Sequence, residues 1–95
     1  MSAYVIVHVD VTNPAEYEDY KKMSPVSITA YGGRFLARGG PTQVLEGSWE
    51  PKRLVIVEFP SAEQARKWWE SPEYAPSKAK RNATSRSELV IVEGV

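Results

Sequence analysis

The chain has 95 residues and carries 12 basic and 12 acidic side chains, so its formal net charge is zero. A chain of this length predicts one domain, residues 1–95, with a single hydrophobic core. The balanced charge argues against nucleic acid or an anionic membrane surface as a partner. Because cysteine is absent, disulfides, thiolate metal sites and a cysteine nucleophile are excluded.

The N-terminal segment predicts a protein that is neither exported nor inserted into a membrane. Met1 to Ala3 lead directly into a short apolar segment, and no basic region precedes it. We therefore expect a soluble, cytoplasmic protein.

The first third of the chain reads as a strand followed by a helix. Residues 4–11 alternate valine with other side chains, which is the two-residue period of a strand. Asn13 then stands before a proline and a glutamate in the pattern of a capped helix start. We expect a kink or restart at Pro25 and a helix end at Gly32–Gly33. The apolar face of this helix comprises Tyr17, Tyr20, Ser24, Ile28 and Tyr31.

The middle of the chain predicts strands separated by glycine-rich turns. The expected strands are Arg34–Arg38, a short one at Thr42–Glu46, and Leu54–Phe59, of which the last is the most apolar.

The last third predicts one more helix and one more strand. Ser61 opens a second capping box, and Ser71–Pro72 ends the helix. Ala62, Ala65 and Trp69 are expected to line one side of this helix. Residues 73–86 are polar and predict a largely exposed helix or coil with little contribution to the core, and residues 89–93 predict the final strand.

The order β-α-β-β-α-β predicts an α+β, ferredoxin-like fold with a four-stranded antiparallel sheet and both helices on one face. The other face stays apolar, because Tyr4 and Ile6 occupy it in the first strand and the strand at 54–59 is apolar on both faces. We therefore expect a homodimer through the open sheet face, with an enclosed, mostly apolar chamber between the sheets that holds a small-molecule ligand.

Several short motifs keep the order and spacing of a known family. They are Tyr31-Gly32-Gly33-Arg34-Phe35, Arg38-Gly39-Gly40, Glu46-Gly47, Phe59-Pro60-Ser61, Trp69, Ser71-Pro72-Glu73-Tyr74, Arg81 and Val92-Glu93-Gly94. Over nearly its whole length the chain resembles the bacterial family called domain of unknown function 1330. That family looks like a branch of the dimeric α/β-barrel superfamily, with antibiotic-biosynthesis monooxygenases and muconolactone-isomerase-like proteins as relatives. The resemblance implies a ferredoxin-like protomer and a back-to-back dimer, and it implies no particular reaction.

Three residues are candidates for catalysis. His8, the single histidine, is expected to face the chamber as a general base, or else to be a packed, hydrogen-bonded residue at the sheet edge. Arg38 is expected to clamp a carboxylate or an enolate, or else to form a salt bridge with Glu46 or Glu58. Glu46 is a candidate acid or base, with the alternative that it fixes Arg38.

Three further residues are candidates for ligand binding. Trp69, Tyr74 and Arg81 are expected to form an aromatic wall with a cationic gate over the cavity, although Trp69 also fits a core position. Trp68 is then expected to point elsewhere, toward the partner subunit. No metal and no cofactor are expected, because one histidine and scattered carboxylates lack the spacing of a ligand set.

Two functional hypotheses follow. In the first, the dimer binds a small carbonyl or carboxylate metabolite, and the resemblance implies cofactor-free oxygenation or isomerisation as its chemistry. In the second, the protein is a non-catalytic dimeric binding or interaction module. Convergence of His8 and Arg38 on one point of an accessible cavity favours the first.

Overall fold

The computed structural model describes residues 1–95 and contains four strands and three helices. They are β1 (Ala3–Val11), α1 (Pro14–Ala30), β2 (Arg34–Arg38), β3 (Arg53–Phe59), α2 (Ala62–Glu70), α3 (Ala75–Thr84) and β4 (Ser85–Glu93). The strands pair antiparallel in the order β2-β3-β1-β4. This confirms the ferredoxin-like α+β fold that the sequence predicts, with α3 as an additional helix.

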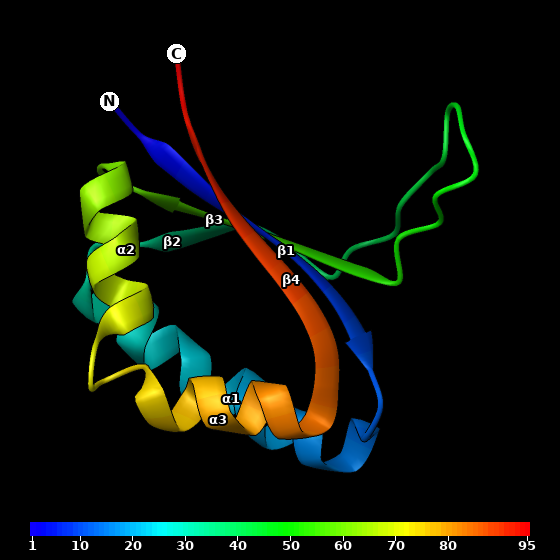
Figure 1. Ribbon diagram of the computed structural model, residues 1–95, viewed down its shortest axis with the longest axis horizontal. Helices are drawn as coiled ribbons and strands as arrows, with labels where there is room; N and C mark the ends of the chain where they lie inside the picture. The colour runs from blue at the N-terminus through cyan, green and yellow to red at the C-terminus, as the bar shows by residue number, and fades with distance from the viewer.

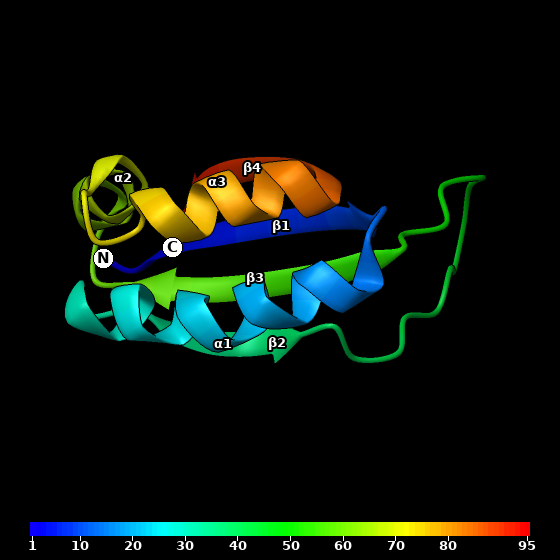
Figure 2. The ribbon, with the colours of Figure 1, turned by 90° about the horizontal axis from the view of Figure 1, so that it is seen from below.

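The molecule has two layers, one of helices and one of strands. All three helices lie on one face of the sheet, and α1 runs beside α3 (Figures 1 and 2). The second face of the sheet is therefore bare of helices, and we call it the open face.

Side-chain alternation in β1 separates the two faces. Val5, Val7 and Val9 are buried under the helices, whereas Ile6 and His8 lie on the open face. Cross-strand pairing carries this division into the neighbouring strands, because paired residues point to the same face. The strand periodicity read from the sequence is thus confirmed.

The centre of the core is aromatic. The rings of Phe59 and Trp68 lie 5.3 Å apart, and those of Trp68 and Tyr74 lie 4.1 Å apart. All three side chains are buried, and they join the end of β3 to α2 and to the start of α3.

Helix α1 begins as predicted but continues through its proline. The Asn13 side chain accepts a hydrogen bond from the Glu16 backbone at 3.2 Å, which caps the first turn. Pro25 lies inside the single 17-residue helix, so of the two expected outcomes, a kink or a restart, the restart is wrong. Pro25 cannot donate to the carbonyl of Lys21, and the guanidinium of Arg38 donates to that carbonyl instead.

Residues 39–52 form a long loop, which we call the arm, that projects from the sheet beyond β2 and β3 (Figure 1). The predicted strand at Thr42–Glu46 is wrong, because this segment has no neighbouring strand with which to form a ladder. Val44, Leu45 and Trp49 are exposed on the arm.

The segment 73–86, predicted to be exposed, contributes a buried face. Tyr74, Ser77, Arg81 and Thr84 recur at three- and four-residue steps, and all four are buried against neighbouring elements. Burial of the polar groups of Tyr74, Arg81 and Thr84 is tolerated here because hydrogen bonds satisfy them. Strand β4 starts at Ser85, four residues earlier than expected.

None of the helices is long and apolar enough to cross a membrane.

Candidate functional site

His8 lies on the open face, next to the arm. Its Nε2 accepts a hydrogen bond of 3.1 Å from the backbone N–H of Lys52, and its ring meets that of Trp49 edge-on at 5.5 Å. The placement matches the expectation of a histidine on the face opposite the helices.

Arg38 lies on the other face, under α1. A bulge between Phe35 and Ala37 shifts the register of β2, so Arg38 pairs with Val55, a residue buried beneath the helices. Its guanidinium lies 4.5 Å from the centre of the Phe35 ring. His8 and Arg38 are therefore separated by the sheet, and within one chain they do not converge on the single point that would favour the catalytic hypothesis.

Glu46 lies on the arm and is exposed. It forms no ion pair with Arg38, and neither does Glu58, which binds Arg34 at 2.6 Å. The hydrogen bond from Arg34 holds the pKa of the Glu58 carboxyl below its ordinary value. The expected salt bridges of Arg38 are thus absent, and the chemical roles expected for His8, Arg38 and Glu46 stay predictions.

Tyr74 and Arg81 are not an exposed gate but the centre of a buried polar cluster. Arg81 donates to the hydroxyl of Tyr74 at 2.6 Å and to the hydroxyl of Ser87 at 3.0 Å. The hydroxyls of Tyr74 and Tyr20 share a hydrogen bond of 2.9 Å. Burial raises the pKa of Tyr74 well above its ordinary value, so its phenol stays protonated at neutral pH. These hydrogen bonds occupy the Tyr74 hydroxyl and the Arg81 guanidinium, the groups that were expected to bind a ligand.

Of the two adjacent tryptophans of α2, Trp68 and not Trp69 takes the core position, so the expectation that Trp68 points toward a partner subunit is wrong. Trp68 is the core residue, and its indole donates to the hydroxyl of Ser27 at 3.2 Å. Trp69 is 40% exposed, with the ammonium of Lys78 lying 3.8 Å from the centre of its ring. The buried face therefore runs through Ala65 and Trp68, and Trp69 is free to contact a ligand.

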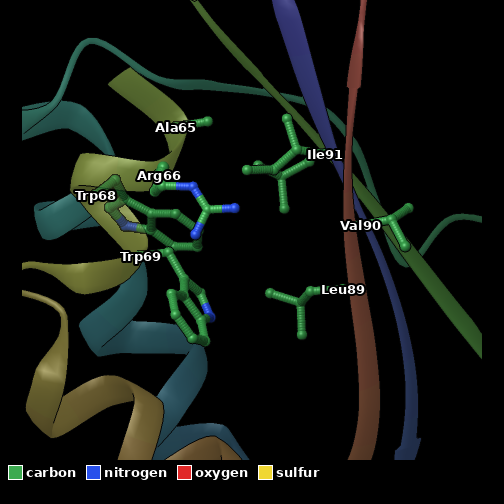
Figure 3. Close-up of a pocket in the computed structure, with 8 residues that line it drawn as sticks. Ala65, Arg66, Trp68, Trp69, Leu89, Val90 and Ile91 are labelled. Atoms are coloured by element: carbon green, nitrogen blue, oxygen red, sulfur yellow. The ribbon is translucent and has the colours of Figure 1, made fainter. Parts of the chain in front are cut away.

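An open groove of about 420 Å³ separates α2 from β4, and it is the candidate site (Figure 3). Seven of its eight lining residues are hydrophobic. Trp69 and Leu89 point toward each other across the groove, and the guanidinium of Arg66 extends from α2 toward β4. The lining residues are Val5, Ala65, Arg66, Trp68, Trp69, Leu89, Val90 and Ile91.

The groove offers apolar contact and one cation. Arg66 also pairs with Glu70 at 3.4 Å, and its side chain is 66% exposed, so this pair holds it only weakly. No carboxylate or imidazole lines the groove. Nowhere in the chain do three or more histidine, aspartate or glutamate side chains group closely enough to hold a metal ion.

Sequence reasoning found Trp69 but missed the rest of the groove. The groove brings together Arg66, Leu89 and Ile91, which are far apart in the sequence. They are neighbours because β4 pairs with β1 and α2 packs next to β4. One local signal was present: the three-residue step from Ala65 to Trp68 marks the buried face, which leaves Trp69 at its border.

The strand order and the single helical layer define a ferredoxin-like α+β protein. The profile of the family described as Domain of unknown function (DUF1330) matches residues 2–95, so the chain belongs to this family. No curated protein matches the chain.

Solved structures share the fold at low sequence identity. A protein of unknown function from Rhodopseudomonas palustris superposes with a TM-score of 0.80 at 18% identity, covering 99% of this chain and 82% of that one. SnoaB, a cofactor-independent oxygenase from Streptomyces nogalater, gives 0.68 at 15% identity, with 99% and 93% covered. A dimeric ferredoxin-like protein of unknown function from a Jannaschia species gives 0.68 at 12%, with 99% and 100% covered. These likenesses establish the fold alone.

Proposed function

We propose that this protein binds a compact, flat and largely apolar small molecule with an oxygen substituent in the groove between α2 and β4. The observation that carries the proposal is the groove itself: about 420 Å³ with seven hydrophobic lining residues of eight. Ligand sites typically measure roughly 300 to 1,000 Å³ and combine apolar walls with a few polar groups.

The arrangement of side chains suits a planar ligand. The Trp69 ring offers a flat surface on α2, and Leu89 and Ile91 face it from β4 (Figure 3). Arg66 supplies N–H donors for a carbonyl or phenolic oxygen on the same molecule. A ligand seated there would cover apolar surface that is otherwise in contact with water.

Cofactor-free oxygenation is the second candidate, and the structural likeness to SnoaB favours it. Enzymes most often move protons with histidine, aspartate or glutamate, and none of these lines the groove. Non-catalytic binding is therefore the function that the lining residues support best.

Association of two copies through the open face belongs to the same proposal. Val90 and Val92 are 58% and 46% exposed on β4, beside Ile6 and Tyr4 of β1. A second sheet laid against this face would remove that apolar surface from water. The dimeric state of the ferredoxin-like protein from Jannaschia supports a dimer, and the exposed apolar side chains are the argument for this face.

Titration with 2-naphthol tests the groove. This neutral bicyclic phenol should shift the NMR signals of the Leu89 and Ile91 methyl groups, and Trp69→Ala should weaken binding roughly tenfold, because a stacked aromatic contact is worth about 0.5–1.5 kcal/mol beyond the area it buries. Trp49→Ala is the matched control, since Trp49 is also exposed but lies on the arm.

Equal weakening by Trp69→Ala and Trp49→Ala, or no methyl shifts at millimolar 2-naphthol, would refute the proposed groove. Oxygen uptake measured in the same mixture separates the two candidate functions. Uptake that depends on Trp69 supports oxygenation of such ligands, and binding without uptake supports the non-catalytic function.

A further inference from the structure

Four cationic side chains meet in a second hollow, at the opposite end of the sheet from the groove. Lys21 and Lys22 of α1, Arg38 of β2 and Arg53 of β3 line an open space of about 300 Å³. No other residue lines it. We call it the basic hollow.

The fold brings these cations together through strand register. Arg53 pairs with Val9 and Arg38 pairs with Val55, and both valines face the helices. The two guanidinium groups therefore point to the helical side, where α1 passes with its two lysines.

The positive charge of the basic hollow is poorly neutralised. Among its four cations only Lys21 has an acidic partner, Glu18, at 2.8 Å. None of the ion pairs in the chain involves Lys22, Arg38 or Arg53. In a chain of zero net charge, four cations with one acid make a local positive field.

Arg53 is held in place by packing against Tyr17 and the backbone at Gly39. Its Nε is buried without any hydrogen-bond partner, and its guanidinium lies 5.7 Å from the centre of the Tyr17 ring. A Cβ added at Gly39 would lie 2.1 Å from Nη1 of Arg53, so glycine at that position makes room for the guanidinium. Gly39 also has a φ of +70°, which favours glycine.

Arg38 is held from two sides. It donates to the Lys21 carbonyl that Pro25 leaves without a helical donor, and it stacks over Phe35. The one hydrogen bond uses one of its five N–H groups. Both guanidinium groups are thus positioned in advance, with donors left for a ligand.

We propose that the basic hollow binds a small, multiply charged oxyanion group, a phosphate or carboxylate cluster carried by a metabolite. Guanidinium groups match both anions with paired N–H donors, and the lysines add charge at the rim. A nucleic-acid strand fits less well, because the cations surround one hollow and do not follow a stripe along the surface.

Isothermal titration with pyrophosphate and with citrate, at low ionic strength, tests the site and separates phosphate from carboxylate chemistry. The wild-type protein should bind at least one of them. Arg38→Gln and Lys22→Glu should raise the Kd roughly tenfold or more, as expected for the loss of a charge-assisted contact. Lys67→Glu is the matched control, because this α2 lysine is 60% exposed and lies away from the hollow.

Lys22→Glu keeps the test decisive should Arg38→Gln disturb α1, since Lys22 is exposed and forms no ion pair. The proposal is overturned if neither anion binds, or if Lys22→Glu and Lys67→Glu change the Kd equally. Tighter binding of single-stranded oligothymidylate than of pyrophosphate through the same residues would overturn it in favour of nucleic acid. None of these outcomes depends on 2-naphthol, so the basic hollow and the groove are tested separately.

Discussion

Arg81 is 4% exposed, and no carboxylate is among its hydrogen-bond partners. Two hydroxyl oxygens and the side-chain oxygen of Asn82 accept from it instead. A buried cation is tolerated only when its donors are satisfied, so Tyr74 and Ser87 are structural partners of Arg81. This explains why α3 buries a face that its composition does not predict.

The buried phenols make stability depend on alkaline pH. Burial raises the pKa of Tyr74 and that of Tyr17 above the ordinary value of 10. Above that pH the unfolded chain loses protons that the folded protein keeps, so the free energy of unfolding falls as pH rises. The slope is at most about 1.4 kcal/mol per pH unit for each such tyrosine, and below pH 10 the contribution is fully present.

Urea unfolding between pH 9 and pH 11 measures this effect. Tyr74→Phe should flatten the fall above pH 10, because the variant has no phenol to titrate at that position, and Tyr17→Phe should act in the same direction. Parallel curves for the wild type and Tyr74→Phe would contradict the assignment of raised pKa values to burial.

At the scale of elements, α2 shows that a shift of one residue along a helix decides which side chain is buried and which is exposed. Successive helical residues differ by about 100° in direction, so Trp68 and Trp69 cannot share a face. The aromatic stack with Phe59 and Tyr74 selects Trp68 for the core, which leaves Trp69 for the groove.

The two tryptophans should therefore differ in their contribution to stability. Trp68→Ala should lower the free energy of unfolding by about 3–5 kcal/mol through loss of buried aromatic contacts. Trp69→Ala should cost less than about 1 kcal/mol, mainly its contact with Lys78. Urea unfolding followed by circular dichroism provides the comparison, and Trp68→Phe serves as a milder variant should Trp68→Ala not fold. A larger loss for Trp69→Ala would contradict this placement of α2.

At the scale of the whole molecule, the placement of all three helices on one side leaves the other sheet face without a protein cover. Tyr4, Ile6, Leu54 and Ile56 lie in the middle of that face and are only partly exposed, whereas the valines of β4 are more open. The proposed cover is a second copy, since a two-fold axis would place apolar strands against their own equivalents.

Val92→Lys should convert a dimer into a folded monomer, because it places a charge in the proposed sheet-to-sheet contact. Val26→Lys is the control, since Val26 is 74% exposed on α1, on the helical side. Light scattering after size exclusion gives the mass, and circular dichroism checks folding. A wild-type monomer at micromolar concentration, or a Val92→Lys dimer, would refute association through the open face.

The sequence by itself determined the order of the four sheet strands and of α1 and α2, the strand periods and the capped starts of both helices. These features depend on neighbouring residues: alternation in β1 marks its two faces, and Asn13 and Ser61 cap with their own side chains. The resemblance to its family also predicted the ferredoxin-like fold of the whole chain, and the structure confirms it.

Only the tertiary structure decided which candidates share a site. Simple alternation from Phe35 would put Arg38 on the same face as His8, but the bulge before Ala37 turns Arg38 to the helical side. A bulge depends on how β2 pairs with β3, and the groove depends on where α2 crosses β4, so neither follows from local pattern. Arg38 consequently meets Arg53 and two lysines in the basic hollow, and the sheet separates it from the histidine.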